Sequence, residues 1–325
     1  MEMNEVMMTL VEDLRTIRGV AETTAHAYVK TLFLLNGKKP FKTLAFLKKT
    51  EDIVKGLSEY ADTTQKAILA TIVSVLSLKP STKKLMEVYR EKLEGKTKEV
   101  VENAPKDGEK SAKQSENWMT WEEVMAKKND LAKAVKESAS KKVLGVGEFD
   151  QLLSLVVLSL YTDIPPRRNQ DFLELAIVKK WTEAMPKEVN YLDVAKKRFI
   201  FNKFKTAKTY GQQVVDIPES LFETLATYIK RHPLAKGKWT QVKLLVSHDG
   251  TPLTAVNSIT RILNKIFGKK VGSSMLRHIF ITDKYGGAKM EMKSDAKAMA
   301  HSVAEQQNVY NVPGGAESHV SIPTI

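Results

Sequence analysis

Apolar residues recur at helical spacing through most of the first hundred residues. The first predicted helix shows this period in five side chains: Val6, Leu10, Val11, Leu14 and Ile17. Gly19 ends that helix, and Asn36-Gly37 followed by Pro40 ends the next one. The same pattern predicts helices over about 23–35, 41–57, 63–76 and 81–93. We therefore expect a compact all-helical module at the N-terminus.

The pattern changes between the helical module and the rest of the chain. Residues 99–117 are polar and contain Pro105 and Gly108, which is typical of an exposed linker. We therefore predict a helical domain over 1–98, a linker over 99–117 and a second domain over 118–325 that includes a C-terminal tail. Thr120 and Glu123 have the spacing of a capping box, which marks the start of the first helix of the second domain.

The second domain mixes two hydrophobic periods. A largely apolar segment predicts a buried helix over about 149–161, followed by a Pro-Pro turn and a helix-like segment over 169–175. Three later segments alternate in the manner of short strands: 191–194, 198–204 and 213–217. A turn is predicted at 208–211, and helices resume after Pro218. The expected fold is mainly α with a small antiparallel β-sheet.

Charge and composition narrow the function further. The 325 residues carry a net charge of +13 and no cysteine, which excludes disulfides and thiolate metal sites. Residues 1–117 hold 20 basic and 17 acidic side chains, whereas 118–325 hold 31 and 21. This surplus favours a polyanionic partner. No apolar run is long enough to span a bilayer, and the N-terminus lacks a basic start, so we expect a soluble intracellular protein.

Residues suited to phosphate chemistry occur in five segments of the second half. In chain order these are 165–171 with Arg168, the hairpin 202–211 with Lys205 and Lys208, 273–279 with Ser274, Arg277 and His278, 299–302 with His301, and 308–310 with Tyr310. His301 precedes Tyr310 by nine residues. Taken singly, each segment also fits an ordinary surface or packing role.

The ordered set resembles the catalytic half of the tyrosine recombinases and integrases, over roughly 150–312. The segment from Arg168 to Asp171 matches that family's Arg-x-x-Glu/Asp element, and Met275-Leu-Arg-His278 matches most of its His-x-Leu-Arg-His box. Met299-Ala-His301 is similar to its Leu-Gly-His box. The N-terminal module is similar to the family's core-binding domain. The resemblance thus implies a helical core-binding domain and an α+β catalytic domain. The double proline is also similar to recombinases of large DNA viruses and mobile elements.

The resemblance implies a role for each of these residues. Arg168 and Arg277 would hold the phosphate oxygens, and Tyr310 would attack to form a 3′-phosphotyrosyl link. Lys205, or alternatively Lys208, would protonate the leaving 5′ oxygen, and His301 would contact the phosphate or accept the tyrosine proton. The chemistry implied needs no metal, ATP or other cofactor.

One position departs from the family pattern. Ser274 occupies the place where the family usually has His or Lys, and a hydroxyl is neither a cation nor a useful acid near neutral pH. Ser274 can still donate one hydrogen bond to a phosphate, and His278 is a further candidate, either for phosphate contact or for a structural role.

The resemblance implies double-stranded DNA as the partner, assembly of two to four copies on it, and a location at DNA inside the cell. The leading hypothesis is a site-specific recombinase or integrase. Two alternatives stay open: a type IB topoisomerase, which shares the chemistry, and a DNA-binding protein of the same fold with weakened catalysis. Ser274 is the only support for a DNA-binding protein with weakened catalysis, and it argues mildly against a type IB topoisomerase.

Overall fold

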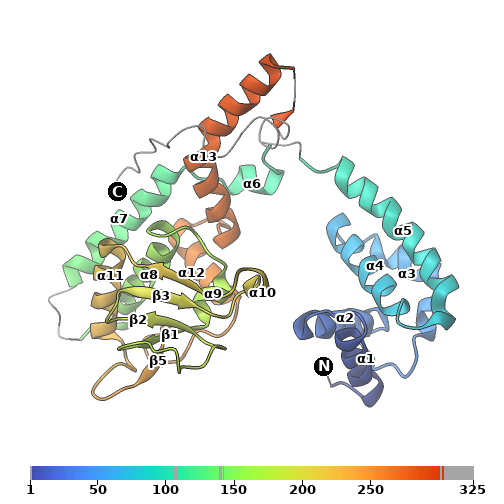
Figure 1. The fold of residues 1–325 in the computed structure, drawn as a ribbon, viewed down its shortest axis with the longest axis horizontal. Coiled ribbons are helices and arrows are strands. Elements are labelled where there is room, and N and C mark those ends of the chain that lie inside the picture. The colour runs from blue at the N-terminus through green and yellow to red at the C-terminus, as the bar shows by residue number, and fades with distance from the viewer. Residues whose placement is uncertain (1, 106–108, 139–140, 142, 301, 304–325) are drawn as a thin grey trace. The chain divides into compact units, whose positions relative to one another are not determined.

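The computed structural model describes residues 2–105, 109–138, 141, 143–300 and 302–303. The chain divides into two compact units, Met1–Ser111 and Ala112–Ile325 (Figure 1). Each unit has a hydrophobic core of its own, so each is described by itself.

The first unit is helical throughout its described part. Its elements are α1 (Glu5–Thr16), α2 (Glu22–Leu35), the 3-10 turn η1 (Ala45–Lys48), α3 (Thr50–Leu57), α4 (Asp62–Leu76), the 3-10 turn η2 (Pro80–Thr82) and α5 (Lys83–Glu102). The core includes Leu14, Leu32 and Ile72, all fully buried. The Tyr89 hydroxyl donates to the Leu47 carbonyl at 2.8 Å, which fixes α5 against η1.

The single helix expected over 41–57 is two shorter elements. Lys49, between η1 and α3, has φ −79° and ψ 59°, which lies outside the helical region. The break lies between Leu47 of η1 and Leu57 of α3, and both leucines are buried in the core of this unit. The fifth helix also continues beyond residue 93 to Glu102, and α6 (Ala112–Asn117) occupies the end of the expected linker. The buried Asn117 accepts a hydrogen bond from the Lys270 amide there.

The second unit is built around one buried helix. Its helices are α7 (Trp121–Ser138), α8 (Val146–Thr162), α9 (Asn169–Leu173), α10 (Ala207–Tyr210), α11 (Glu219–Arg231), α12 (Asn257–Phe267) and α13 (Ser273–Ala298). The core of the unit holds most of α8, which packs against α7, α11 and α12. The predicted capping box is confirmed: the Glu123 amide donates to Thr120 Oγ1, and the Thr120 amide donates to the Glu123 carboxylate.

A five-stranded sheet packs beside these helices in the order β4-β3-β2-β1-β5 (Figure 1). The strands are β1 (Leu175–Val178), β2 (Asn190–Asp193), β3 (Arg198–Phe201), β4 (Gln213–Asp216) and β5 (Gln241–Lys243). The expected antiparallel sheet is confirmed for three of the four pairings, whereas β1 and β2 are parallel, so the sheet is mixed. The connection 179–189 is long enough to return the chain over the sheet, as a parallel pair requires.

Both faces of the sheet are covered. On one face, Ile177, Leu192 and Phe199 join the main core with the helices. On the other face, a smaller cluster of Ala176, Val178, Tyr191 and Ile200 packs under Trp181, Met185 and Val189 from the β1–β2 connection. All four residues of β1 are buried, as expected of a strand with packing on both sides. Within the described ranges, no helix combines the length and apolarity needed to cross a membrane.

Candidate functional site

The first arginine of the candidate site lies where α8 gives way to α9. The chain leaves α8 at Thr162 and turns through Pro165 and Pro166, which cannot continue a helix. Arg168 follows as the N-cap of α9, with extended backbone (φ −76°, ψ 148°) and a carbonyl that accepts from the Asp171 amide. Its side chain is partly buried and makes no hydrogen bond or ion pair with any described residue.

The second arginine lies in the first turns of α13. Leu276 and Ile279 of this helix are buried in the main core, which places the partly buried Arg277 beside them at the edge of that core. Arg277 Nε donates to the Ser273 carbonyl at 3.3 Å. Its two terminal nitrogens have no partner among the described residues, so they are available to an anion.

Arg168 and Arg277 line one surface pocket of about 200 Å³ although they lie 109 positions apart in the chain. The other lining residues are Pro166, Arg167, Asp171, Phe204, Thr206, Tyr210 and Gln213. Three arginines and one aspartate therefore contribute to the lining of one small cavity. Guanidinium groups bind phosphate oxygens through paired N–H donors, so the pocket suits a phosphate.

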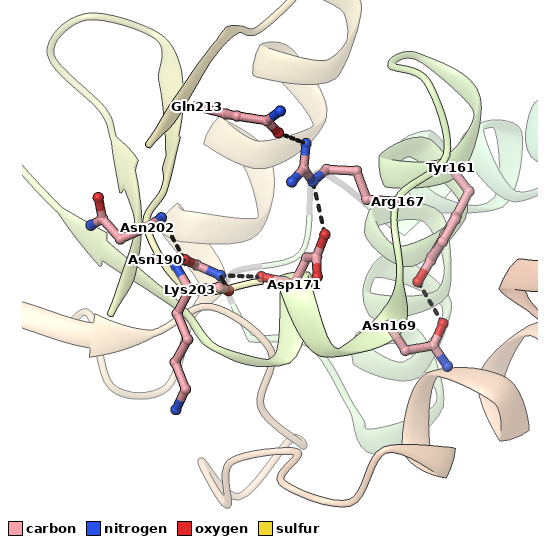
Figure 2. A network of polar contacts seen from close by, with 8 residues as sticks. All are labelled: Tyr161, Arg167, Asn169, Asp171, Asn190, Asn202, Lys203 and Gln213. Atoms are coloured by element: carbon pink, nitrogen blue, oxygen red, sulfur yellow. Dashed lines mark hydrogen bonds and ion pairs between the residues drawn. The ribbon is translucent and has the colours of Figure 1, made fainter. Parts of the chain in front are cut away.

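Arg167 is held far more tightly than Arg168, and sequence reasoning gave it no role. Its Nε donates to Asp171 Oδ2 at 3.0 Å, and its Nη1 donates to Gln213 Oε1 at 2.8 Å (Figure 2). The guanidinium carbon also lies 3.9 Å from the centre of the Phe201 ring. Asp171 belongs to the Arg-x-x-Asp motif that begins at Arg168, but its carboxylate binds the neighbouring Arg167 instead. The only sequence feature that could have pointed to Arg167 was its position directly before Arg168.

Asn190 extends this network to the start of the β3–β4 connection. Its side-chain amide donates to the Asp171 and Lys203 carbonyls, both at 2.9 Å. Its carbonyl oxygen accepts from the Asn202 and Lys203 amides at 2.9 and 2.7 Å. Figure 2 shows the Lys203 side chain pointing away from the network, where its ammonium lies 3.9 Å from Glu174. Fully buried, Asn190 satisfies four backbone groups that would otherwise lack partners.

Burial acts against both charges of the Arg167–Asp171 pair. It raises the pKa of the Asp171 carboxyl, an effect opposed by Arg167 and Arg168, and it lowers the pKa of the Arg167 guanidinium. Arginine stays protonated in proteins, so Arg167 keeps its charge. Burial also raises the pKa of Tyr161, whose hydroxyl donates to Asn169 Oδ1 at 2.8 Å (Figure 2). Tyr161 is therefore a neutral structural phenol near the pocket.

The remaining predicted site residues that the structure describes lie near the pocket without lining it. Lys205 is exposed in the turn after β3, and Lys208 is exposed on α10. Their neighbours Thr206 and Tyr210 do line the pocket. Ser274 and His278 are exposed on α13, next to Arg277 in sequence. The predicted turn at 208–211 is partly the single turn α10, which is capped by Gly211 with φ 66°, a conformation that glycine adopts without steric cost.

His301 and Tyr310 lie outside the described residues, so their predicted roles stay predictions. One phenol does line the pocket: Tyr210, whose side chain is 66% exposed. Sequence reasoning missed Tyr210 as a site residue. An exposed phenol beside two arginines needs an experimental control, because it is chemically capable of the attack assigned to Tyr310.

Two other observations bear on the choice of site. A larger cavity of about 530 Å³ lies in the first unit, but its lining is mostly apolar, and Glu5 and Asp13 face it beside Lys42, Lys48 and Lys79. It therefore has no convergent charge of one sign. Within the described residues, no group of three or more His, Asp or Glu side chains is placed to hold a metal ion.

Comparisons with known proteins give little further information. The chain matches no protein-family model and no curated protein. A solved structure described as the crystal structure of XerA recombinase aligns with 94% of this chain and 92% of that chain, at 18% sequence identity and a TM-score of 0.31. A similarity at this TM-score carries no argument about fold or function.

Proposed function

We propose that this protein cleaves and rejoins DNA strands as a tyrosine recombinase, through a covalent link between Tyr310 and a 3′ phosphate. The observation that carries the proposal is that Arg168 and Arg277, picked out by motif alone, line the same pocket with free guanidinium nitrogens. The basic surplus of the second unit supports a polyanionic substrate.

In the proposed reaction, the Tyr310 phenol gives its proton to His301 and its oxygen attacks phosphorus, while the bond to the 5′ oxygen breaks. The phosphate oxygens gain negative charge in the transition state, and donors from Arg168 and Arg277 stabilise that charge. The leaving 5′ oxygen takes a proton from Lys205 or Lys208. Attack of a 5′ hydroxyl on the phosphotyrosine reverses these steps, so no energy source is consumed. DNA, assembly of two to four copies on it, and an intracellular location belong to this proposal.

The test is covalent capture on DNA of random sequence. The full chain is incubated with a pool of nicked duplexes randomised around the nick, so that cleavage releases a short strand and traps the adduct. We expect an adduct that withstands denaturation, disappears in Tyr310→Phe and persists in the control Tyr210→Phe. Arg168→Ala and Arg277→Ala should each slow its formation by about 10²- to 10³-fold, the usual effect of losing one transition-state donor.

Each outcome distinguishes a different function. If the adduct is lost in Tyr210→Phe but not in Tyr310→Phe, the nucleophile is Tyr210 in the β3–β4 connection, and the role of Tyr310 is refuted. Adducts of no sequence preference, together with relaxation of supercoiled plasmid, would indicate a type IB topoisomerase. Binding to the pool without any adduct would indicate a DNA-binding protein without strand-cleaving activity and would refute the proposal.

A further inference from the structure

We infer that Arg167 is a positioning residue: with Asp171 and Asn190 it holds both ends of the β3–β4 connection, 202–212, against the helix start that carries Arg168. This inference rests on the proposed function, because the connection contains Lys205 and Lys208, the two candidates for the general acid. It assigns a task to a charged pair that the proposed chemistry leaves unused.

The returning end of the connection is held by Arg167. Gln213 is the first residue of β4, and its side-chain carbonyl accepts from Arg167 Nη1 at 2.8 Å (Figure 2). The same guanidinium binds Asp171 and lies against the Phe201 ring at 3.9 Å and the Phe204 ring at 5.1 Å. One side chain therefore contacts α9, the last residue of β3, the connection itself and the first residue of β4.

The starting end of the connection is held by Asn190. Its four hydrogen bonds join the Asp171 carbonyl to the backbone of Asn202 and Lys203. Asn202 in turn accepts from Gln212 Nε2 at 2.6 Å, which closes the two ends of the connection on each other. Both ends are therefore linked to Asp171. Asn190 links the starting end to the Asp171 backbone carbonyl, and Arg167 links the returning end to the Asp171 carboxylate.

This arrangement fits a positioning role better than a phosphate-binding one. Arg167 uses its Nε and one terminal nitrogen inside the protein, whereas Arg168 has no partner among the described residues. A proton donor must stay within hydrogen-bonding reach of the leaving oxygen, and a displacement of about 1 Å costs on the order of a hundredfold in rate. The lysines lie on an exposed turn, so their position depends on how its two ends are held.

The first test needs no substrate. Trypsin should cut after Lys205 and Lys208 faster when the connection opens, and mass spectrometry resolves each cut in the full chain. We expect Arg167→Met and Gln213→Leu to speed cutting at both lysines by about tenfold or more, since each removes a contact that opposes local opening. Gln213→Leu leaves the Arg167–Asp171 pair intact, so it serves even if Arg167→Met folds poorly.

The matched control is Arg198→Met. Arg198 Nε binds the buried Asp193 at 3.1 Å, its guanidinium lies over the Trp181 ring, and its side chain is 21% exposed against 17% for Arg167. It begins the same strand that Phe201 ends and does not line the pocket. Loss of this equivalent pair should leave the cutting rate at Lys205 and Lys208 unchanged.

The second test separates proton donation from phosphate binding. It uses the duplex recovered by covalent capture, made with either the ordinary 5′ oxygen or a 5′ sulfur at the scissile bond. A thiolate leaves without a proton, so it removes the need for a general acid. We expect Arg167→Met and Gln213→Leu to slow adduct formation by about ten- to a hundredfold on oxygen and by less than about threefold on sulfur. Arg168→Ala should form the adduct slowly on both the oxygen and the sulfur substrate. Of the Lys205 and Lys208 variants, the one whose rate the sulfur substrate restores identifies the general acid.

The possible failures are distinguishable. Unchanged trypsin cutting in both variants would overturn the inference, and so would a cleavage defect that sulfur does not relieve. If wild-type protein forms no adduct on either DNA, the proposed function fails and the positioning of a general acid fails with it. A trypsin result with faster cutting would then still support the hold on the connection as a structural feature alone.

Discussion

At the scale of single residues, the buried His232 shows how the second unit responds to pH. His232 is 1% exposed, and its Nε2 lies 3.0 Å from the Lys243 carbonyl oxygen and 3.3 Å from that of Leu244. Its Nδ1 accepts from the Leu234 amide at 3.2 Å. These contacts fit the neutral ring with its proton on Nε2, because a second proton on Nδ1 would face an N–H donor. Burial lowers the pKa of His232 below 6.5.

The lowered pKa gives a stability prediction of defined sign. As pH falls below 6.5, the unfolded state binds a proton before the native state does, so the free energy of unfolding decreases. Between pH 7.5 and 5.5, we expect wild type to lose more stability in urea than His232→Gln. All four tryptophans lie in the second unit, so their fluorescence follows its unfolding. His278→Gln, which removes an exposed histidine, should keep the wild-type loss, and an equal loss in all three proteins would contradict the prediction.

The candidate site was predictable at the residue scale only in part. The resemblance to the tyrosine recombinases singled out Arg168 and Arg277, and the two line one pocket. Spacing could not show that Asp171 binds Arg167, because that choice depends on where Gln213 and the Phe201 ring lie in the folded sheet. Tyr210 was missed for the same reason, since an exposed phenol in a turn has no sequence signature.

At the scale of elements, the stability of the second unit depends most on α8. This helix has ten buried residues and packs against three other helices. Leu158 is fully buried in it, so Leu158→Ala should lower the free energy of unfolding by about 2–5 kcal/mol, through lost apolar burial and the cavity left behind. Urea denaturation followed by tryptophan fluorescence measures the change. Leu234→Ala, at a side chain 41% exposed, should cost far less, and equal losses would mean that α8 is not the centre of this core.

Elements with a clear period were predicted and the others were not. Strands β2, β3 and β4 were predicted from their short strand-like period, and the buried α8 from its largely apolar sequence. Strand β1 was missed because Leu175–Val178 are all apolar, so no polar residue marks the strand; the equally buried β2 carries Asn190 and Asp193 at its ends. Strand β5 has only three residues, too few for a period. The parallel pairing of β1 with β2 follows from β1 itself, so it was missed with that strand.

At the scale of the whole molecule, the two units differ in net charge. The first unit has only a small basic excess, and most of the net charge of +13 belongs to the second. Some of the basic side chains are paired with acidic ones: Lys197 pairs with Glu219 at 2.8 Å, and Arg198 pairs with Asp193. Lys205 and Lys208 are exposed and have no ion pair among the described residues. The unpaired lysines, rather than the total charge, should therefore determine how the protein meets a polyanion.

This reasoning predicts the salt dependence of DNA binding. Each lysine that neutralises a phosphate releases counterions, so affinity for a duplex should fall linearly on a plot of log affinity against log salt concentration. Replacing Lys205 or Lys208 by Gln should reduce the magnitude of that slope by about 1, measured by fluorescence anisotropy of a labelled duplex in a KCl series. Lys197→Gln removes the same charge where Glu219 already neutralises it, so its slope should equal that of wild type. If the three variants behave alike, the surface around the pocket is not the one that contacts DNA, whatever the chemistry of the pocket itself.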